Sequence, residues 1–231
     1  MAVLIDEDMF GPFVYKYRLQ VTRDQDAARI KAGKDYFAEK RKEWIIAGKG
    51  KFGLIQFGAV ELPWHAEFLP EQLTLTEGEA LPDWVHAFPG GSYQFSHASL
   101  VTSNVRDIIE SHRSENDAWK FFPVKILRKD GSEYGTYYAW WIDRVCDAVD
   151  EASEGVKLVS KPKDGNHLWT TQGEPTPDRL SLHKSQIEGL NAWTDFRISA
   201  SKCVFVSDKL FSTLGSGDLQ GFAAKSIWSE K

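Results

Sequence analysis

Residues 121–142 read FFPVKILRKDGSEYGTYYAWWI, and this stretch decides the fold. Aromatic and β-branched residues fill its two arms, which is typical of two strands, 121–127 and 134–142. The Asp130-Gly131 pair between them supplies the positive φ angles of a tight turn. Because side chains alternate along a strand, Trp140 and Trp141 must point to opposite faces. We therefore predict a β-hairpin with one of these tryptophans in the core and the other packed under a helix or exposed as a contact residue.

A strand, a helix cap and an amphipathic helix occur twice in the sequence. In the first copy a strand at 98–101 leads to Thr102 or Ser103 as the cap and to a helix that runs to about residue 112. LVTSNV (100–105) aligns with FVSDKL (205–210), which makes Ser207 the cap of the second copy. The return strands 119–127 and 219–228 follow. The sequence therefore predicts an α+β fold, with a mixed or antiparallel sheet and flanking helices, and leaves open whether the two copies are related halves.

The N-terminal part of the chain contains a helical pattern at 24–46. Apolar residues fall near one stripe of this helix: Ala27, Ile30, Phe37 and Trp44. We expect a strand at 52–60 and, because four prolines interrupt 61–89, a long ordered loop with short pieces there. The expected organisation is a helical and strand extension, 1–60, packed on a main α+β domain, 61–231, as one continuous globular unit.

Composition places the chain among ordinary globular proteins. Its 231 residues are 42% hydrophobic and 26% charged, which suffices for a core without disulfides or metals. No run approaches the roughly 20 apolar residues of a membrane-spanning helix, and acids at 6–8 stand where a signal peptide would be basic and then apolar. We therefore expect a cytoplasmic protein without a membrane partner. Cys146 and Cys203 lie far apart and lack a nearby histidine at ligand spacing, which favours two buried reduced thiols.

The sequence lacks the residue patterns on which the common enzyme classes depend. Its six histidines are scattered, without the HxH or HExxH spacing that places two nitrogens on one metal. No GxGxxG or GxxxxGK[ST] motif follows an expected strand, so a nucleotide cradle has no support. We therefore predict that the chain is not an enzyme and needs no metal or cofactor.

Charge is distributed unevenly along the chain. Residues 61–110 contain eight acids and one base, within a chain whose formal net charge is −5. This segment argues against a nucleic-acid partner, which needs clustered Lys and Arg. Its acids are either a solvated face or steering charges for a basic partner, and its tryptophans are either core residues or interface anchors. The candidate partner-binding residues are Trp64, Glu67, Glu71, Glu77, Glu79, Asp83 and Trp84.

Several short segments of the chain resemble a known family. They are DRLSLH (178–183), IEG (187–189), DFR (195–197), VFVSDKL (204–210) and LQGF (219–222), with FFPV (121–124) and VCDAVD (145–150) upstream. In these segments the chain resembles the eleventh-numbered immunity protein family of bacterial polymorphic toxin systems, formerly a domain of unknown function. The resemblance covers about residues 80–228, and residues 1–60 add nothing to it.

The resemblance implies a protein that is encoded beside a toxin gene and that protects the producing cell by binding the cognate toxin. The family has no catalytic residues to carry over. A basic toxin, a nuclease for example, would suit the acidic segment. The residues leave two alternatives open, an enzyme of unrecognised type and an adaptor that regulates another cellular protein. An inhibitor must match the toxin mole for mole, whereas an enzyme protects at small fractions.

Overall fold

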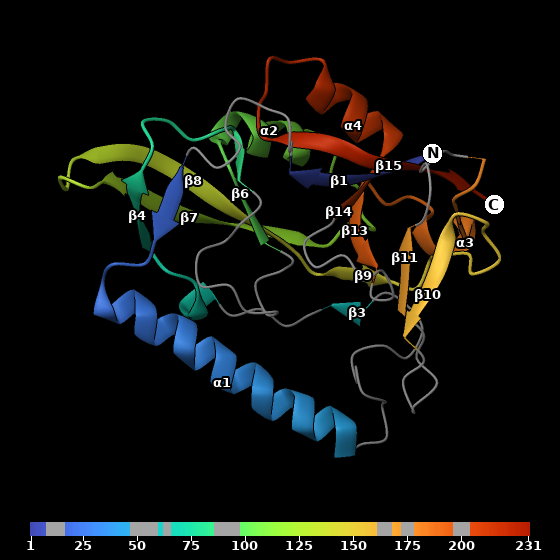
Figure 1. The fold of residues 1–231 in the computed structure, drawn as a ribbon, viewed down its shortest axis with the longest axis horizontal. Helices are drawn as coiled ribbons and strands as arrows, with labels where there is room; N and C mark the ends of the chain where they lie inside the picture. Colours follow the sequence, from blue (N-terminus) through green and yellow to red (C-terminus); the bar gives the residue numbers. More distant parts are fainter. Residues whose placement is uncertain are drawn as a thin grey trace.

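The computed structural model describes residues 1–7, 17–46, 60–61, 66–85, 98–160, 168–171, 178–195 and 204–231. Within these ranges, strands of two large curled sheets make up most of the fold, and four helices accompany them (Figure 1). The α+β class predicted from the sequence is confirmed.

The first large sheet is built around the predicted hairpin. It contains β2 (Arg18–Gln20), β4 (Gln72–Glu77), β5 (Trp84–Val85), β6 (Ala98–Val101), β7 (Trp119–Arg128) and β8 (Glu133–Ile142). The strands lie in the order β2–β4–β7–β8–β6–β5, and only β4 and β7 are parallel neighbours. In the hairpin turn Gly131 has a φ of 86°, which glycine adopts without strain. The hairpin prediction is confirmed.

The N-terminal strand lies in the interior of the second large sheet. It contains β1 (Ala2–Glu7), β3 (Val60–Glu61), β9 (Arg144–Cys146), β12 (Ser181–Leu182), β13 (Ala192–Asp195), β14 (Val204–Ser207) and β15 (Phe222–Glu230). The order is β12–β15–β1–β14–β13–β9–β3, so β1 lies between β14 and β15 and runs antiparallel to both. Ala2 and Ile5 of β1 are fully buried. The segment expected as an N-terminal extension thus supplies an interior strand.

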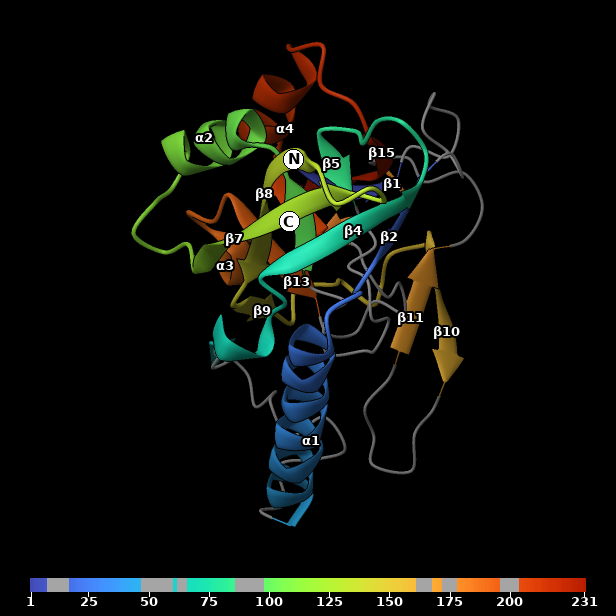
Figure 2. The same ribbon diagram turned by 90° about the vertical axis from the view of Figure 1, so that its left-hand side faces the viewer.

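The remaining elements lie around these sheets. They are α1 (Asp24–Ile46), α2 (Ser103–Ser111), α3 (Lys184–Ile187), α4 (Asp208–Gly215), the 3-10 helix η1 (Ala66–Phe68) and a two-stranded sheet of β10 (Val156–Ser160) and β11 (Leu168–Thr171). Figures 1 and 2 both show α2 and α4 side by side at one end of the molecule and α1 extending from the opposite end.

The two predicted strand–helix copies have the same arrangement in space. In the first, β6 and β7 flank β8 and both run antiparallel to it, with α2 between them in sequence. In the second, β14 and β15 flank β1 in the same way, with α4 between them. The caps differ, because the Ser207 hydroxyl accepts a hydrogen bond from the Leu210 N–H, whereas Thr102 makes no side-chain cap bond. Each unit is thus a crossover around one central antiparallel strand.

Trp140 and Trp141 are both buried, on opposite faces of β8. Trp140 belongs to a core that also contains Val105 and Ile109 of α2 and Leu210 of α4, so this tryptophan packs under the helices. Trp141 belongs to a second core on the other face of the sheet. The predicted opposite faces are confirmed, and of the two alternatives left open for the second tryptophan the structure has the buried one, under a helix.

The segment 61–89, expected as a long ordered loop with short pieces, contains more strand than we expected. The prediction of a long loop missed β4, whose residues Leu73 to Leu75 are buried between β2 and β7. Prolines at 70 and 82 flank this strand without interrupting it, so they mark its ends. Residues 62–65 and 86–89 lie outside the described part of the chain, as do residues 52–59 of the strand predicted next to them.

Helix α1 has the predicted bounds, and its buried face coincides only in part with the predicted stripe. Ala27 is exposed, and the residues buried on its first three turns are Asp26, Ile30 and Gly33. A methyl group at Gly33 would lie 2.9 Å from the Cβ of Phe68, so the helix approaches η1 at a position where only glycine fits. The side chains of Phe37 and Trp44 are outside the described residues. Of the predicted stripe, Ile30 is therefore buried and Ala27 is not, because the charged Asp26 occupies the inner face in its place.

The cap of α4 gives a stability prediction. The Ser207 hydroxyl accepts from the Leu210 N–H at 3.2 Å and donates to the Asn191 side-chain oxygen at 3.0 Å. We expect Ser207→Ala to lower the free energy of unfolding by about 0.5–2 kcal/mol, because it removes the cap. Ser212→Ala, on the exposed side of the same helix, is the control and should change it by less than about 0.5 kcal/mol. Equal denaturant midpoints for the two variants would reject the cap.

Candidate functional site

The candidate residues do not form one patch. Trp64 lies outside the described part of the chain. Glu67 and Glu71 are exposed near the start of β4, and Glu77 and Glu79 are exposed near its end. Glu71 and Glu77 lie six positions apart along extended chain, which is about 20 Å at 3.3 Å per residue. The four candidate glutamates therefore divide into two separate groups at opposite ends of one strand.

Trp84 is a core residue. It is fully buried, its ring lies 5.3 Å from Trp140 in an edge-to-face contact, and Phe222 packs against it at 5.4 Å. A side chain in this position cannot contact a partner unless the core opens. The sequence left a choice between core and interface anchor, and the structure places Trp84 in the core.

Asp83 holds three segments of the fold together. Its carboxylate accepts hydrogen bonds from the Thr102 hydroxyl at 3.2 Å and from the Gln220 N–H at 3.1 Å. Its carbonyl accepts from the Thr102 N–H, and the neighbouring Trp84 N–H donates to the Gln220 carbonyl. This acid thus joins β5 to the start of α2 and to the segment before β15, and its contacts are structural.

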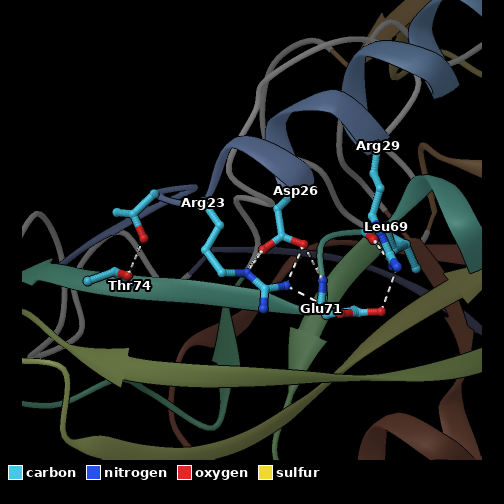
Figure 3. Close-up of polar contacts among 7 residues, drawn as sticks. Arg23, Asp26, Arg29, Leu69, Glu71 and Thr74 are labelled. Atoms are coloured by element: carbon cyan, nitrogen blue, oxygen red, sulfur yellow. Dashed lines mark hydrogen bonds and ion pairs between the residues drawn. The ribbon is translucent and has the colours of Figure 1, made fainter.

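At the start of β4, two arginines of the α1 region meet two acids (Figure 3). Asp26 is fully buried, and its carboxylate receives Arg23 Nε at 2.6 Å, Arg23 Nη2 at 2.9 Å and the Glu71 N–H at 3.0 Å. The Glu71 carboxylate receives Arg23 at 3.3 Å and Arg29 at 2.6 Å. Arg29 also donates to the Leu69 carbonyl at 3.5 Å. We call these four side chains, Arg23, Asp26, Arg29 and Glu71, the α1 clasp.

The electrostatics of the α1 clasp favour a charged Asp26. Burial alone would raise the pKa of Asp26, but the hydrogen bonds from Arg23 and from the Glu71 N–H outweigh it. The positive charges of Arg23 and Arg29 act in the same direction, and the pKa lies below its ordinary value. Because Glu71 already has two arginine partners, much of its charge is neutralised within the protein.

At the end of β4, the acids lie beside the β7–β8 hairpin. Glu77 forms an exposed ion pair with Arg18 of β2 at 3.3 Å. The Glu79 carbonyl accepts a hydrogen bond from Arg128, the last residue of β7, at 3.4 Å, so this turn and the hairpin turn are neighbours. Both glutamates are exposed. The hairpin turn was not expected as part of this surface, because the contact between Arg128 and Glu79 joins residues 49 positions apart.

The described residues do not form a metal site. No group of three or more His, Cys, Asp or Glu side chains among them is placed to hold a metal ion. Cys146 is buried, and burial raises the pKa of its thiol to about 12, which makes it an unreactive core residue. Cys203 is outside the described residues. Among the helices described, none is long and apolar enough to cross a membrane.

Comparison with known protein families identifies the family of this chain. The model of the immunity protein family Imm11 matches residues 24–227. The chain belongs to the Imm11 immunity protein family. The match begins at the first residue of α1, so Asp26, Arg29 and Glu71 of the α1 clasp lie within the family region and Arg23 directly precedes it. The sequence motifs placed the start of the resemblance near residue 80. No curated protein matches the chain at a significant level.

The α1 clasp predicts a pH-dependent contribution to stability. Asp26→Asn removes the charge that Arg23 contacts, and we expect it to lower the free energy of unfolding at pH 7 by about 1.5–3 kcal/mol. Because the folded-state pKa of Asp26 is lowered, this contribution is complete above the unfolded pKa, near 3.9, and is lost as the pH falls through the lower folded pKa. The difference between the two proteins should therefore shrink below about pH 4.

Asp35→Asn is the matched control for Asp26→Asn. Asp35 lies on the same helix and pairs with Lys31, but its side chain is 64% exposed. We expect Asp35→Asn to change stability by less than about 0.5 kcal/mol. Chemical denaturation between pH 3 and 7 measures both variants. A pH-independent effect of Asp26→Asn would contradict the charged clasp.

Proposed function

We propose that this chain neutralises a bacterial toxin by binding it directly, one immunity protein to one toxin, in the cytoplasm of the producing cell. The Imm11 match over residues 24–227 carries this proposal. Interior strands, buried aromatic clusters and a fixed hairpin support it, since a rigid surface binds with little loss of conformational freedom. Binding either covers the active site of the toxin or prevents its folding.

The exposed acids are the proposed steering charges. Glu77 and Glu79 at the end of β4 and Glu67 near its start project into solvent, where they attract a basic surface. Toxins that cut nucleic acid carry such a surface, because they must grip a phosphate backbone. A basic nuclease is therefore the proposed kind of partner. Glu71 contributes less, because both Arg23 and Arg29 neutralise its charge, whereas Glu77 has one exposed pair with Arg18.

The alternatives are an enzyme of unrecognised type and an adaptor for another cellular protein. An enzyme would remove or modify many toxin molecules per copy, whereas an inhibitor is consumed by its complex. An adaptor would bind a partner other than the product of the adjacent toxin gene. The family match favours a toxin partner over both alternatives.

Titration of the toxin separates binding from catalysis. We expect residual toxin activity to fall linearly with added immunity protein and to reach its floor at one equivalent, because each copy is held in a complex. The toxin is the purified product of the adjacent gene, assayed far above the dissociation constant. Complete protection at a small fraction of an equivalent would identify an enzyme instead.

Association kinetics test the steering charges. The double variant Glu77→Lys, Glu79→Lys should associate with the toxin about tenfold more slowly than the wild type at low salt and should lose most of the salt dependence. Its dissociation rate should change little, because rim charges act on the encounter. Glu188→Lys, an exposed residue after α3, is a control for a change of charge elsewhere. An unchanged association rate would mean that these acids are only a solvated face.

A further inference from the structure

The turn between β7 and β8, residues 128–133, is the most prominent projection of the first sheet. All six of its residues are exposed. It lies at one end of the longest axis of the molecule, beyond β4 and β6 (Figure 1), and beside the end of β4 when the molecule is turned (Figure 2). Arg128 contacts the Glu79 carbonyl, so this turn and the acidic turn after β4 form one surface.

Hydrogen bonds fix the backbone of the β7–β8 turn. The Gly131 N–H donates to the Arg128 carbonyl at 3.0 Å, and the Arg128 N–H donates to the Ser132 carbonyl at 2.8 Å. The Asp130 carboxylate accepts from both the N–H and the hydroxyl of Ser132, at 2.9 and 2.6 Å. These two bonds hold the pKa of Asp130 below its ordinary value, so the acid is ionised at neutral pH. The turn is therefore organised before any partner binds.

Each charged side chain of the turn except one has a partner in the described part of the protein. Glu133 pairs with Lys125 at 2.8 Å, and the Arg128 guanidinium lies 4.8 Å from the centre of the Tyr134 ring. Lys129 is exposed and has no ion pair among the residues that the structure describes. It occupies the second position of the β-turn from Arg128 to Gly131, which is the outermost part of the hairpin.

We propose that the β7–β8 turn inserts into a concave site of the toxin and that Lys129 pairs with a carboxylate inside it. This inference rests on the proposed function and names the contact by which it acts. A convex, rigid turn fits a cleft at low conformational cost. A lysine that loses its water in a cleft needs a negative charge beside it, and hydrolytic sites commonly supply carboxylates as metal ligands or as acid–base groups.

The acidic turn beside the hairpin fits the same site. A nuclease that holds carboxylates at the bottom of its cleft needs basic residues around the rim, where the phosphate backbone of its substrate lies. With Lys129 inside the cleft, Glu77 and Glu79 would face that rim. The alternating charges of this end of the molecule therefore match one kind of partner, an enzyme with an acidic centre and a basic surround.

The test compares two lysine variants with equal changes of charge. Lys129→Glu alters the turn, and Lys157→Glu alters an exposed lysine of β10 in the separate two-stranded sheet. The probe is the product of the adjacent toxin gene, purified in a catalytically inactive form, and affinity is measured by calorimetry. We expect Lys129→Glu to weaken binding at least about tenfold and Lys157→Glu to leave it within about twofold. Equal thermal midpoints establish that both variants are folded.

The outcomes separate this inference from the proposed function. If the wild type binds the toxin and Lys129→Glu binds equally well, the turn is not the contact, although binding itself stands. Equal losses of affinity for the two lysine variants would mean that overall charge, and not the turn, determines binding. This result would also overturn the assignment. If the wild type does not bind the toxin at all, the proposed function itself is wrong, and the inference that rests on it is wrong as well. Ser132→Ala removes the hydroxyl bond to Asp130 and leaves the bond from the backbone N–H, without changing charge. It should weaken binding a few-fold, because the turn is then less firmly fixed before it binds.

Discussion

The burial of β8 on both faces is the constraint on which the rest of the structure depends. Trp140 contacts Trp84 at 5.3 Å and Trp119 at 6.0 Å on one face, and Trp141 enters the other core. A slip of one residue in the pairing of β8 would exchange the two faces, so the register is fixed. This register also fixes β6 and β7 on either side and determines where the hairpin turn projects from the sheet.

The α1 clasp shows why a count of charges is a poor guide to a surface. The segment 61–110 carries eight acids and one base in sequence, but arginines from outside it meet several of those acids in space. Arg18 pairs with Glu77, Arg23 and Arg29 pair with Glu71, and Arg113 pairs with Glu110. The net field of this region is therefore weaker than its composition indicates, and its two ends have to be considered separately.

Local signals predicted the elements whose structure depends on neighbouring residues. The hairpin, the bounds of α1 and the Ser207 cap follow from turn chemistry, periodicity and capping, which act over a few positions. The sequence could not predict the place of β1, because its partners lie about 200 residues or more away in the sequence. It also missed β4, where the prolines on either side obscured the alternation. Asp83 and Trp84 illustrate the same limit, since a steering acid and a structural acid look alike until their partners are known.

The contact surface of a toxin complex is best located by hydrogen exchange. Exchange of the backbone amides in the free chain is compared with exchange in the complex with the inactive product of the adjacent toxin gene. Direct binding through the strand ends predicts slower exchange at residues 77–80 and 128–133, with little change in the interior of β8, which is already protected. Protection confined to other segments, or no change anywhere in the chain, would contradict it.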